Sequence, residues 1–117
     1  GNALACRAAL AVLDIFEEDR VIESNRARQT RFDAMTTALS RHPKISNFRQ
    51  RGMIWAFEVN SGRADFARVF HHAALQHQLL LRPIGSTVYF MPPYIITDAE
   101  FQHLVDATLA SLNQVLA

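Results

Sequence analysis

Prolines and a glycine divide residues 81–96 into short segments, and this stretch restricts the possible folds more than any other. Arg82-Pro83 ends an apolar run, and the proline ring fixes the direction in which the chain leaves. Gly85-Ser86 predicts a turn, and Val88–Met91 is typical of a strand. Pro92-Pro93 then blocks further ladder pairing, because proline has no backbone N–H. A cation held on so stiff a turn suits an anion-binding position.

The bulk numbers indicate a single globular domain. The chain has 117 residues, of which 50% are hydrophobic and 20% charged, enough for one core. Twelve basic and 11 acidic residues leave a formal net charge of +1. This balance argues against a nucleic-acid or membrane-surface partner.

The termini and the single cysteine bear on location. Apolar runs are short, so no transmembrane helix is expected, and the first residues lack the pattern of a signal peptide. Cys6 cannot form an internal disulfide and fits a reducing compartment, so we expect a cytoplasmic protein. We expect Cys6 to be a small buried residue rather than a nucleophile. The chain begins without Met, and we interpret it as a fragment of a longer one.

Hydrophobic periodicity predicts the order α-α-β-β-α-β-β-α. The expected helices cover residues 3–18, 20–41, 64–77 and 98–115, and the expected strands cover 45–51, 54–59, 79–82 and 87–91. Both faces of 54–59 are mostly apolar, which indicates a central strand. The pattern predicts an α+β two-layer sandwich, with helices packed on one face of a largely antiparallel sheet of about four strands.

Three local signals complete this outline. Glu17–Asp19 is expected to be a solvated turn, and Thr97–Glu100 matches a helix capping box. The second helix carries arginines on one face, which usually means only a solvated face. These are Arg26, Arg28, Arg31 and Arg41.

Three sequence words resemble the class III (fold type I) aminotransferases. They are Gly1–Cys6, Arg51–Ile54 and, most specifically, the 81–96 stretch with its Leu-Arg-Pro-x-Gly and Tyr-Phe-Met-Pro-Pro-Tyr-Ile-Ile words. The last word is similar to that of the biotin-biosynthetic members. Order and spacing agree with the family over nearly all 117 residues.

The resemblance implies a C-terminal small domain, residues 1–117, of an enzyme that uses pyridoxal phosphate as a homodimer. It implies that Arg82 binds the carboxylate of 8-amino-7-oxononanoate, the acceptor of an amino group from S-adenosylmethionine. Tyr89 is expected in the substrate region, and Ile84 replaces an aromatic residue of some members in the pocket wall. From the residues alone, pairing of Arg82 with a surface carboxylate is the commoner arrangement, and this alternative stays open.

Catalytic and cofactor-binding residues are not expected in this chain. Transamination needs a lysine that forms an imine with the cofactor, a carboxylate at the pyridine nitrogen and a phosphate cup. The only lysine, Lys44, lies outside the family words. In the family these groups belong to the large domain, so we expect residues 1–117 alone neither to bind the cofactor tightly nor to turn over.

A metal site is disfavoured, and two alternatives to the function implied by the resemblance stay open. The five histidines lack the spacing of a zinc site, so no metal is expected. The parent could be another class III aminotransferase acting on ω-amino acids. A freestanding, non-catalytic ferredoxin-like domain that binds a ligand or partner is the third reading. Packing of residues 3–18 within one compact monomer would favour that reading, whereas a protruding helix would favour a fragment.

Overall fold

A three-stranded antiparallel sheet forms one layer of the computed structural model, which describes residues 1–117. Its strands are β1 (Ile45–Arg51), β2 (Ile54–Val59) and β3 (Thr87–Phe90), in the order β1-β2-β3. β2 is central, as its two apolar faces predict. The tight turn between β1 and β2 places Gly52 at φ +58°, a conformation that glycine adopts without steric cost.

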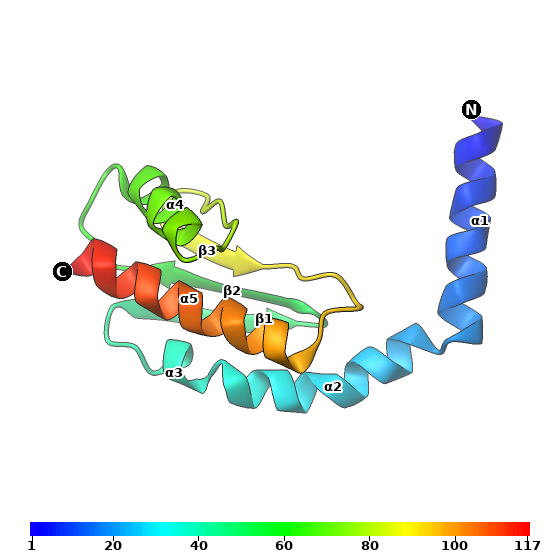
Figure 1. Cartoon of the computed structure of the whole chain (residues 1–117), viewed down its shortest axis with the longest axis horizontal. Coiled ribbons are helices and arrows are strands. Elements are labelled where there is room, and N and C mark those ends of the chain that lie inside the picture. The colour runs from blue at the N-terminus through cyan, green and yellow to red at the C-terminus, as the bar shows by residue number, and fades with distance from the viewer.

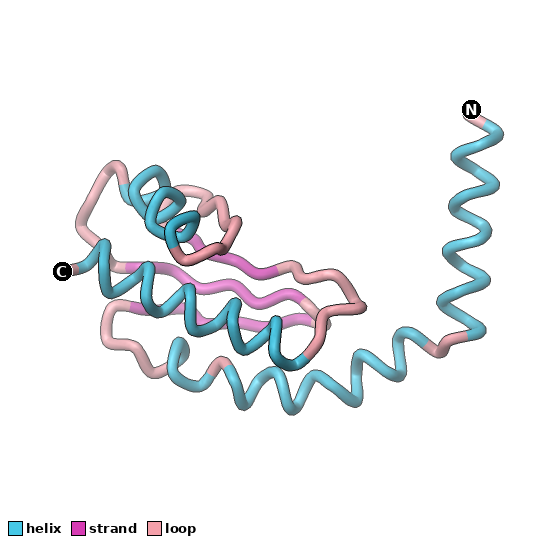
Figure 2. Tube along the Cα trace, viewed as in Figure 1, coloured by secondary structure: helices cyan, strands magenta, loops and turns pink.

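Four helices pack against one face of this sheet (Figures 1 and 2). They are α2 (Val21–Met35), α3 (Thr37–Ser40), α4 (Phe66–Gln76) and α5 (Asp98–Leu116). Alternate side chains of the strands, including Trp55, Phe57, Val88 and Phe90, are fully buried between the two layers. The predicted α+β class, with helices on one face of an antiparallel sheet, is therefore confirmed.

Aromatic side chains join the layers at the centre of the core. The rings of Phe32 from α2 and Phe101 from α5 stack with centroids 4.2 Å apart. Trp55 from β2 lies 4.9 Å from Phe101, and its indole N–H donates to Asp33 Oδ1 at 2.9 Å. The one polar atom of this large buried ring is thus satisfied, as burial requires.

Two predicted elements differ from the structure. Leu79–Arg82 is not a strand, so the sheet has three strands rather than about four. The helix expected over residues 20–41 is divided into α2 and α3 at Thr36. The hydroxyls of Thr36 and Thr37 donate to the carbonyls of Asp33 and Ala34 at 2.8 and 2.7 Å, a local bonding pattern that competes with a continuous helix.

Helix α1 (Ala3–Glu18) extends away from the other elements (Figure 1). Its bounds are those predicted, 3–18; Glu17 and Glu18, which were also assigned to the expected turn, belong to the helix, and the turn follows at Asp19 and Arg20, whose φ is +48°. No residue of α1 is buried, so Cys6 is exposed, contrary to the prediction. Residues 3–18 lie outside the compact body, which argues against the freestanding-domain alternative.

No helix of the chain combines the length and the apolar character needed to cross a membrane.

Candidate functional site

A tight turn between α4 and β3 contains Ile84 and separates the other two candidate residues, Arg82 before it and Tyr89 after it. Ile84 and Thr87 exchange two backbone hydrogen bonds, of 2.9 and 3.0 Å, which leaves Gly85-Ser86 as the turn. Gly85 has φ +60°, so the first central position favours glycine. The turn predicted at these residues is therefore confirmed, and it leads directly into β3.

Arg82 lies on the loop before this turn, at a shallow surface hollow of about 290 Å³. We name this feature the Arg82 hollow; it is lined by Leu80, Leu81, Arg82, Tyr89 and Met91. Arg82 is exposed and takes part in none of the chain's four ion pairs. The alternative of a pairing with a surface carboxylate is therefore not realised, and the guanidinium is free to meet an anion from outside.

Tyr89 approaches the same hollow from β3. Its neighbours Val88 and Phe90 point into the core and are fully buried, whereas Tyr89 lies on the other strand face and is half-buried. The structure thus brings Arg82 and Tyr89 together. Ile84 does not line the hollow: it sits on the turn with 71% of its surface exposed.

Arginines of α2 fix the segment that follows β3. The guanidinium of Arg28 lies 4.8 Å from the centre of the Phe32 ring and donates to the carbonyls of Tyr94, at 2.8 Å, and Ile96. Arg31 forms an ion pair of 2.9 Å with Asp98 at the first turn of α5. The interpretation of this helix face as merely solvated is therefore wrong for these two arginines.

Sequence reasoning missed Arg28 and Arg31 because their partners are 66 to 68 residues away along the chain. The only local signal is their spacing of three residues, which places both on one side of a helix. That spacing does not identify the loop they contact.

The shifted pKa values of the chain belong to groups that do not line the Arg82 hollow. Asp65, at the N-terminus of α4, has its pKa held below the ordinary value, first by a hydrogen bond from Arg63 and then by the charges of Arg63 and Arg68. The pKa of Glu100 is also lowered, by hydrogen bonds from the backbone and side chain of Thr97. These shifts reflect helix-terminal bonding and do not mark an acid–base pair at the hollow.

The residues near Arg82 do not fit pyridoxal phosphate. The lining of the hollow contains no lysine to form an imine and no carboxylate to face a pyridine nitrogen. Lys44 is exposed on the turn before β1, where its backbone carbonyl accepts from Asn60. What the arrangement offers is one cation beside apolar surface and a phenol, which can bind and orient a carboxylate on an apolar chain.

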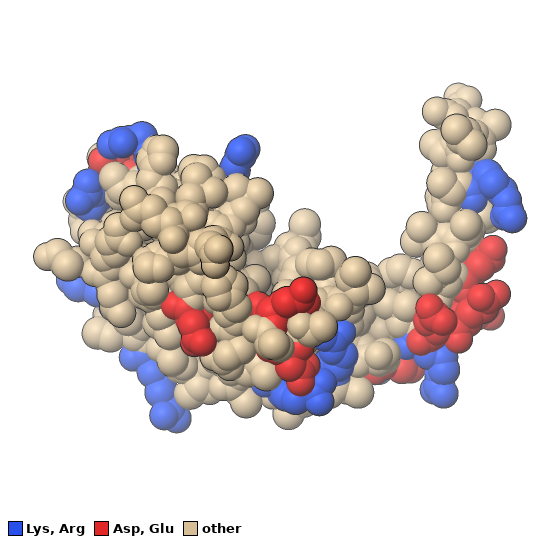
Figure 3. Space-filling model, in the orientation of Figure 1, with Lys and Arg blue, Asp and Glu red and all other residues tan.

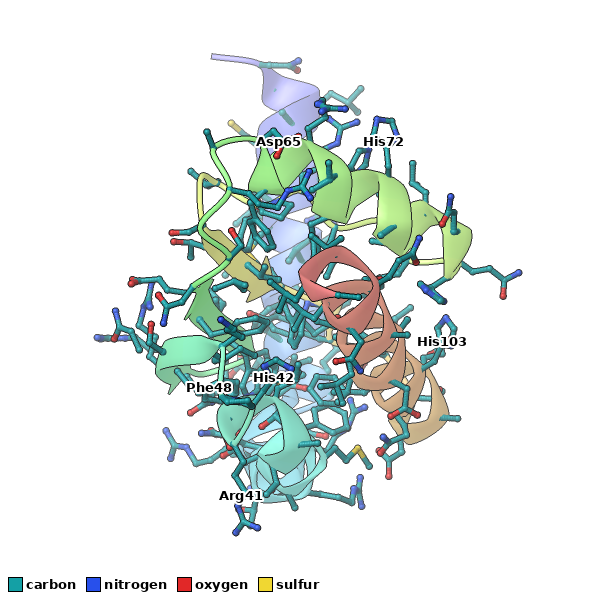
Figure 4. The ribbon with its side chains drawn as sticks, turned by 90° about the vertical axis from the view of Figure 1, so that its left-hand side faces the viewer. Arg41, His42, Phe48, Asp65, His72 and His103 are labelled. Atoms are coloured by element: carbon teal, nitrogen blue, oxygen red, sulfur yellow. The ribbon has the colours of Figure 1, made fainter.

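The histidines are dispersed among structural roles. His71 Nδ1 lies 2.7 Å from the carbonyl of Leu81, His77 bonds to Gln114, and His42 Nδ1 accepts from the amide of Lys44. Figure 4 shows His72 and His103 on the outer sides of α4 and α5. No three histidine, cysteine or acidic residues come close enough together to hold a metal ion.

Comparisons of the sequence with known proteins find aminotransferases. A family model described as aminotransferase class-III matches residues 1–112. The chain is 39% identical over 120 residues to the adenosylmethionine-8-amino-7-oxononanoate aminotransferase of Helicobacter pylori, an alignment that covers 98% of this chain and 28% of that relative. It is 32% identical over 109 residues to the acetylornithine aminotransferase of Synechocystis sp., covering 91% of this chain and 25% of that relative.

A solved structure gives the same result for the fold. The adenosylmethionine-8-amino-7-oxononanoate aminotransferase of Methanocaldococcus jannaschii is similar with a TM-score of 0.85 and 27% identity, over 97% of this chain and 28% of that one. The chain therefore spans between 25% and 28% of the length of these three proteins.

Proposed function

Because the chain belongs to the class-III aminotransferase family, we propose that residues 1–117 form the small, C-terminal domain of an aminotransferase that uses pyridoxal phosphate. The enzyme acts as a homodimer, and the large domain of the same polypeptide holds the cofactor. This assignment is consistent with the share of the relatives' length that the chain spans. It is also consistent with the lack of an imine-forming lysine at the Arg82 hollow.

The reaction is the transfer of the amino group of S-adenosylmethionine to 8-amino-7-oxononanoate, which gives 7,8-diaminononanoate for biotin synthesis. The name of the Helicobacter pylori relative supports this substrate pair, as does the Met91–Ile96 word. One structural observation supports the proposal that this site binds the substrate carboxylate: the guanidinium of Arg82 is exposed, free of any ion pair, and beside an apolar hollow.

In this function, Arg82 binds the carboxylate of the oxononanoate. A guanidinium presents parallel N–H groups that match the two carboxylate oxygens, so the contact fixes orientation as well as position. The methylene chain of the substrate lies along Leu80, Leu81 and Met91. Tyr89 contributes its ring and hydroxyl to the same wall, whereas Ile84 lies on the turn outside the hollow and is assigned no contact.

Binding at the far end of the substrate aids the reaction by alignment. When the carboxylate is held, the keto group at the other end is presented to the cofactor in a restricted set of positions, which converts binding energy into orientation. Pyridoxal phosphate supplies the electron sink of transamination when the large domain holds it. Residues 1–117 supply the carboxylate contact.

The test is the Arg82→Ala variant of the protein encoded by the complete gene. Loss of a charge-assisted, bidentate contact of about 1.5–3 kcal/mol predicts a KM for 8-amino-7-oxononanoate about 10- to 150-fold higher. The KM for S-adenosylmethionine should change little. Arg41→Ala is the matched control, because Arg41 is an exposed arginine at the end of α3 that forms no ion pair (Figure 4). An Arg82→Ala enzyme with the wild-type KM for the oxononanoate would falsify the proposed role.

A second candidate is another amino donor and acceptor within the same family. The 32% identity to an acetylornithine aminotransferase favours keeping it. A screen of amino donors separates the two, since activity with S-adenosylmethionine supports the first and activity only with ornithine-type or other ω-amino donors supports the second.

A further inference from the structure

The backbone around Arg82 forms almost no hydrogen bonds with the rest of the chain. Leu79 N–H donates to the carbonyl of Ala74 at 2.9 Å, and Ile84 N–H donates to the carbonyl of Thr87 at 2.9 Å. Between these two bonds, residues 80–83 form no backbone–backbone hydrogen bond. The expected strand at this position would have supplied several, so its absence leaves the direction of Arg82 to other contacts.

A single side chain supplies the missing support. His71 of α4 places Nδ1 2.7 Å from the carbonyl oxygen of Leu81, and this is the only hydrogen bond that residues 80–83 make. A carbonyl oxygen only accepts, so Nδ1 carries the hydrogen and donates it. The Leu81 side chain adds apolar packing against the core.

The bonded carbonyl is the one that controls Arg82. The carbonyl of Leu81 and the N–H of Arg82 belong to the same planar peptide unit. A bond that fixes this carbonyl therefore fixes the plane from which the Arg82 side chain departs. On the other side, Pro83 has a fixed φ, which limits the freedom of the chain after Arg82.

We propose that His71 is a positioning residue for Arg82: its Nδ1–H holds the Leu81 carbonyl and so aims the guanidinium at the hollow. The inference rests on the proposed function of Arg82 for its consequence in catalysis. The restriction of Arg82 by His71 does not depend on that function, because it follows from the hydrogen bond between His71 and the Leu81 carbonyl. A charged group that is held in place before binding loses less entropy when its ligand arrives.

The first test measures the motion of Arg82 in the 117-residue chain by NMR relaxation. His71→Phe keeps a ring of similar shape and removes the donor. We expect the order parameter of the Arg82 amide to fall from a rigid value toward that of a flexible loop, from about 0.85 to below about 0.6. His71→Asn should restore rigidity, because its amide nitrogen takes the place of Nδ1. An Arg82 amide that stays rigid in His71→Phe overturns the proposal.

His72→Phe is the matched control. His72 is the next residue of α4, is exposed, and lies on the outer side of the helix (Figure 4). It should leave Arg82 unchanged, and an equal loosening in both variants would assign the effect to α4 in general. Should His71→Phe fail to fold, His71→Gln replaces it, since its nitrogen reaches the Nε2 position instead and should loosen Arg82 in the same way.

The second test separates positioning from general damage, in the protein encoded by the complete gene. Loss of one hydrogen bond, worth about 1 kcal/mol, predicts a roughly fivefold higher KM for 8-amino-7-oxononanoate in His71→Phe, with His71→Asn near wild type. In an Arg82→Ala background, His71→Phe should cause no further rise in KM, because His71 acts only through the Arg82 side chain and that side chain is absent. A further rise in KM there, or no rise in the single variant while Arg82→Ala raises it, overturns the positioning role. If Arg82→Ala itself leaves KM unchanged, the proposed function fails and the relaxation result alone decides on His71.

Discussion

At the scale of single residues, one arginine holds the loop that the prolines shape. Arg28 donates to two carbonyls of the segment between β3 and α5, those of Tyr94 and Ile96, while its guanidinium lies over the Phe32 ring. Pro92 and Pro93 have no backbone N–H to donate, and the carbonyls of Tyr94 and Ile96 accept from a side chain outside the segment, that of Arg28. Arg28 therefore joins α2 to the loop beside β3 through a contact that no surface charge pattern reveals.

Replacing Arg28 by methionine isolates the hydrogen bonds, because methionine keeps an apolar stem over Phe32. We expect Arg28→Met to lower the free energy of unfolding by about 1–3 kcal/mol, the cost of leaving carbonyls without a charged donor. Urea denaturation followed by the fluorescence of Trp55 measures it. Arg41→Met serves as control and should stay within about 0.5 kcal/mol of wild type, as is usual for an exposed side chain without partners. Equal effects of the two substitutions would show that the Arg28 bonds add nothing.

At the scale of elements, the N-terminus of α5 is the most completely specified boundary in the chain. The Thr97 hydroxyl accepts from Glu100 N–H at 3.2 Å, and the Glu100 carboxylate accepts from Thr97 N–H at 2.7 Å and from the hydroxyl at 2.8 Å. Both halves of the predicted capping box are present. The bonds from Thr97 favour the charged carboxylate, and this lowers the pKa of Glu100.

The sign of the resulting pH dependence follows from that direction. A carboxyl whose pKa is lower in the folded state stabilises the fold above its unfolded pKa, about 4.3, and loses this contribution as the pH falls through the folded value. We expect a carboxyl ¹³C NMR titration to place the pKa of Glu100 below the ordinary value and to show a rise in Thr97→Val, which lacks the hydroxyl. The backbone N–H remains in that variant, so the rise should be partial. A Glu100 that titrates normally in the wild-type chain contradicts the capping account.

The same scale shows what the sequence could and could not predict. The bounds predicted for β1 and β2 match the structure, because their alternation and the Gly52 turn are local signals. Leu79–Arg82 alternates in the same way: Leu79 is buried, Leu80 is 69% exposed and Leu81 is partly buried. An extended segment alternates whether or not a strand pairs with it, so periodicity could not reveal that this one has no ladder.

The candidate site also has a part that local sequence signals predict and a part that they do not. That Arg82 and Tyr89 could share one surface was predictable, because a short turn brings the two segments on its sides together. The contribution of Arg28 and His71 was not, because each bonds to a backbone carbonyl, which leaves no trace in the side-chain pattern of its partner. Contacts of this kind depend on how helices are placed against loops, which is decided by packing across the whole chain.

At the scale of the whole molecule, α1 decides the shape. The radius of gyration is 16.5 Å, whereas a compact chain of this length has about 13 Å. The excess comes from a helix that touches the body mainly at its base, where Phe16 meets Tyr94 edge to face at 5.6 Å. Figure 3 shows mostly uncharged surface toward the free end of this helix. Its exposed large apolar residues are Leu4, Leu10, Val12, Leu13 and Ile15.

An apolar helix so exposed favours association, since contact with another surface removes its side chains from water. We therefore expect the 117-residue chain to self-associate through α1, and sedimentation velocity over a concentration series should show species heavier than the monomer. Leu4→Glu combined with Val12→Glu should shift the chain toward monomer, because the charges oppose burial while glutamate keeps the helix propensity. Arg7→Glu, which changes the net charge by the same amount, should still associate. A wild-type chain that sediments only as monomer at every concentration contradicts this expectation, and equal loss of association in both variants would assign the effect to charge instead of apolar contact.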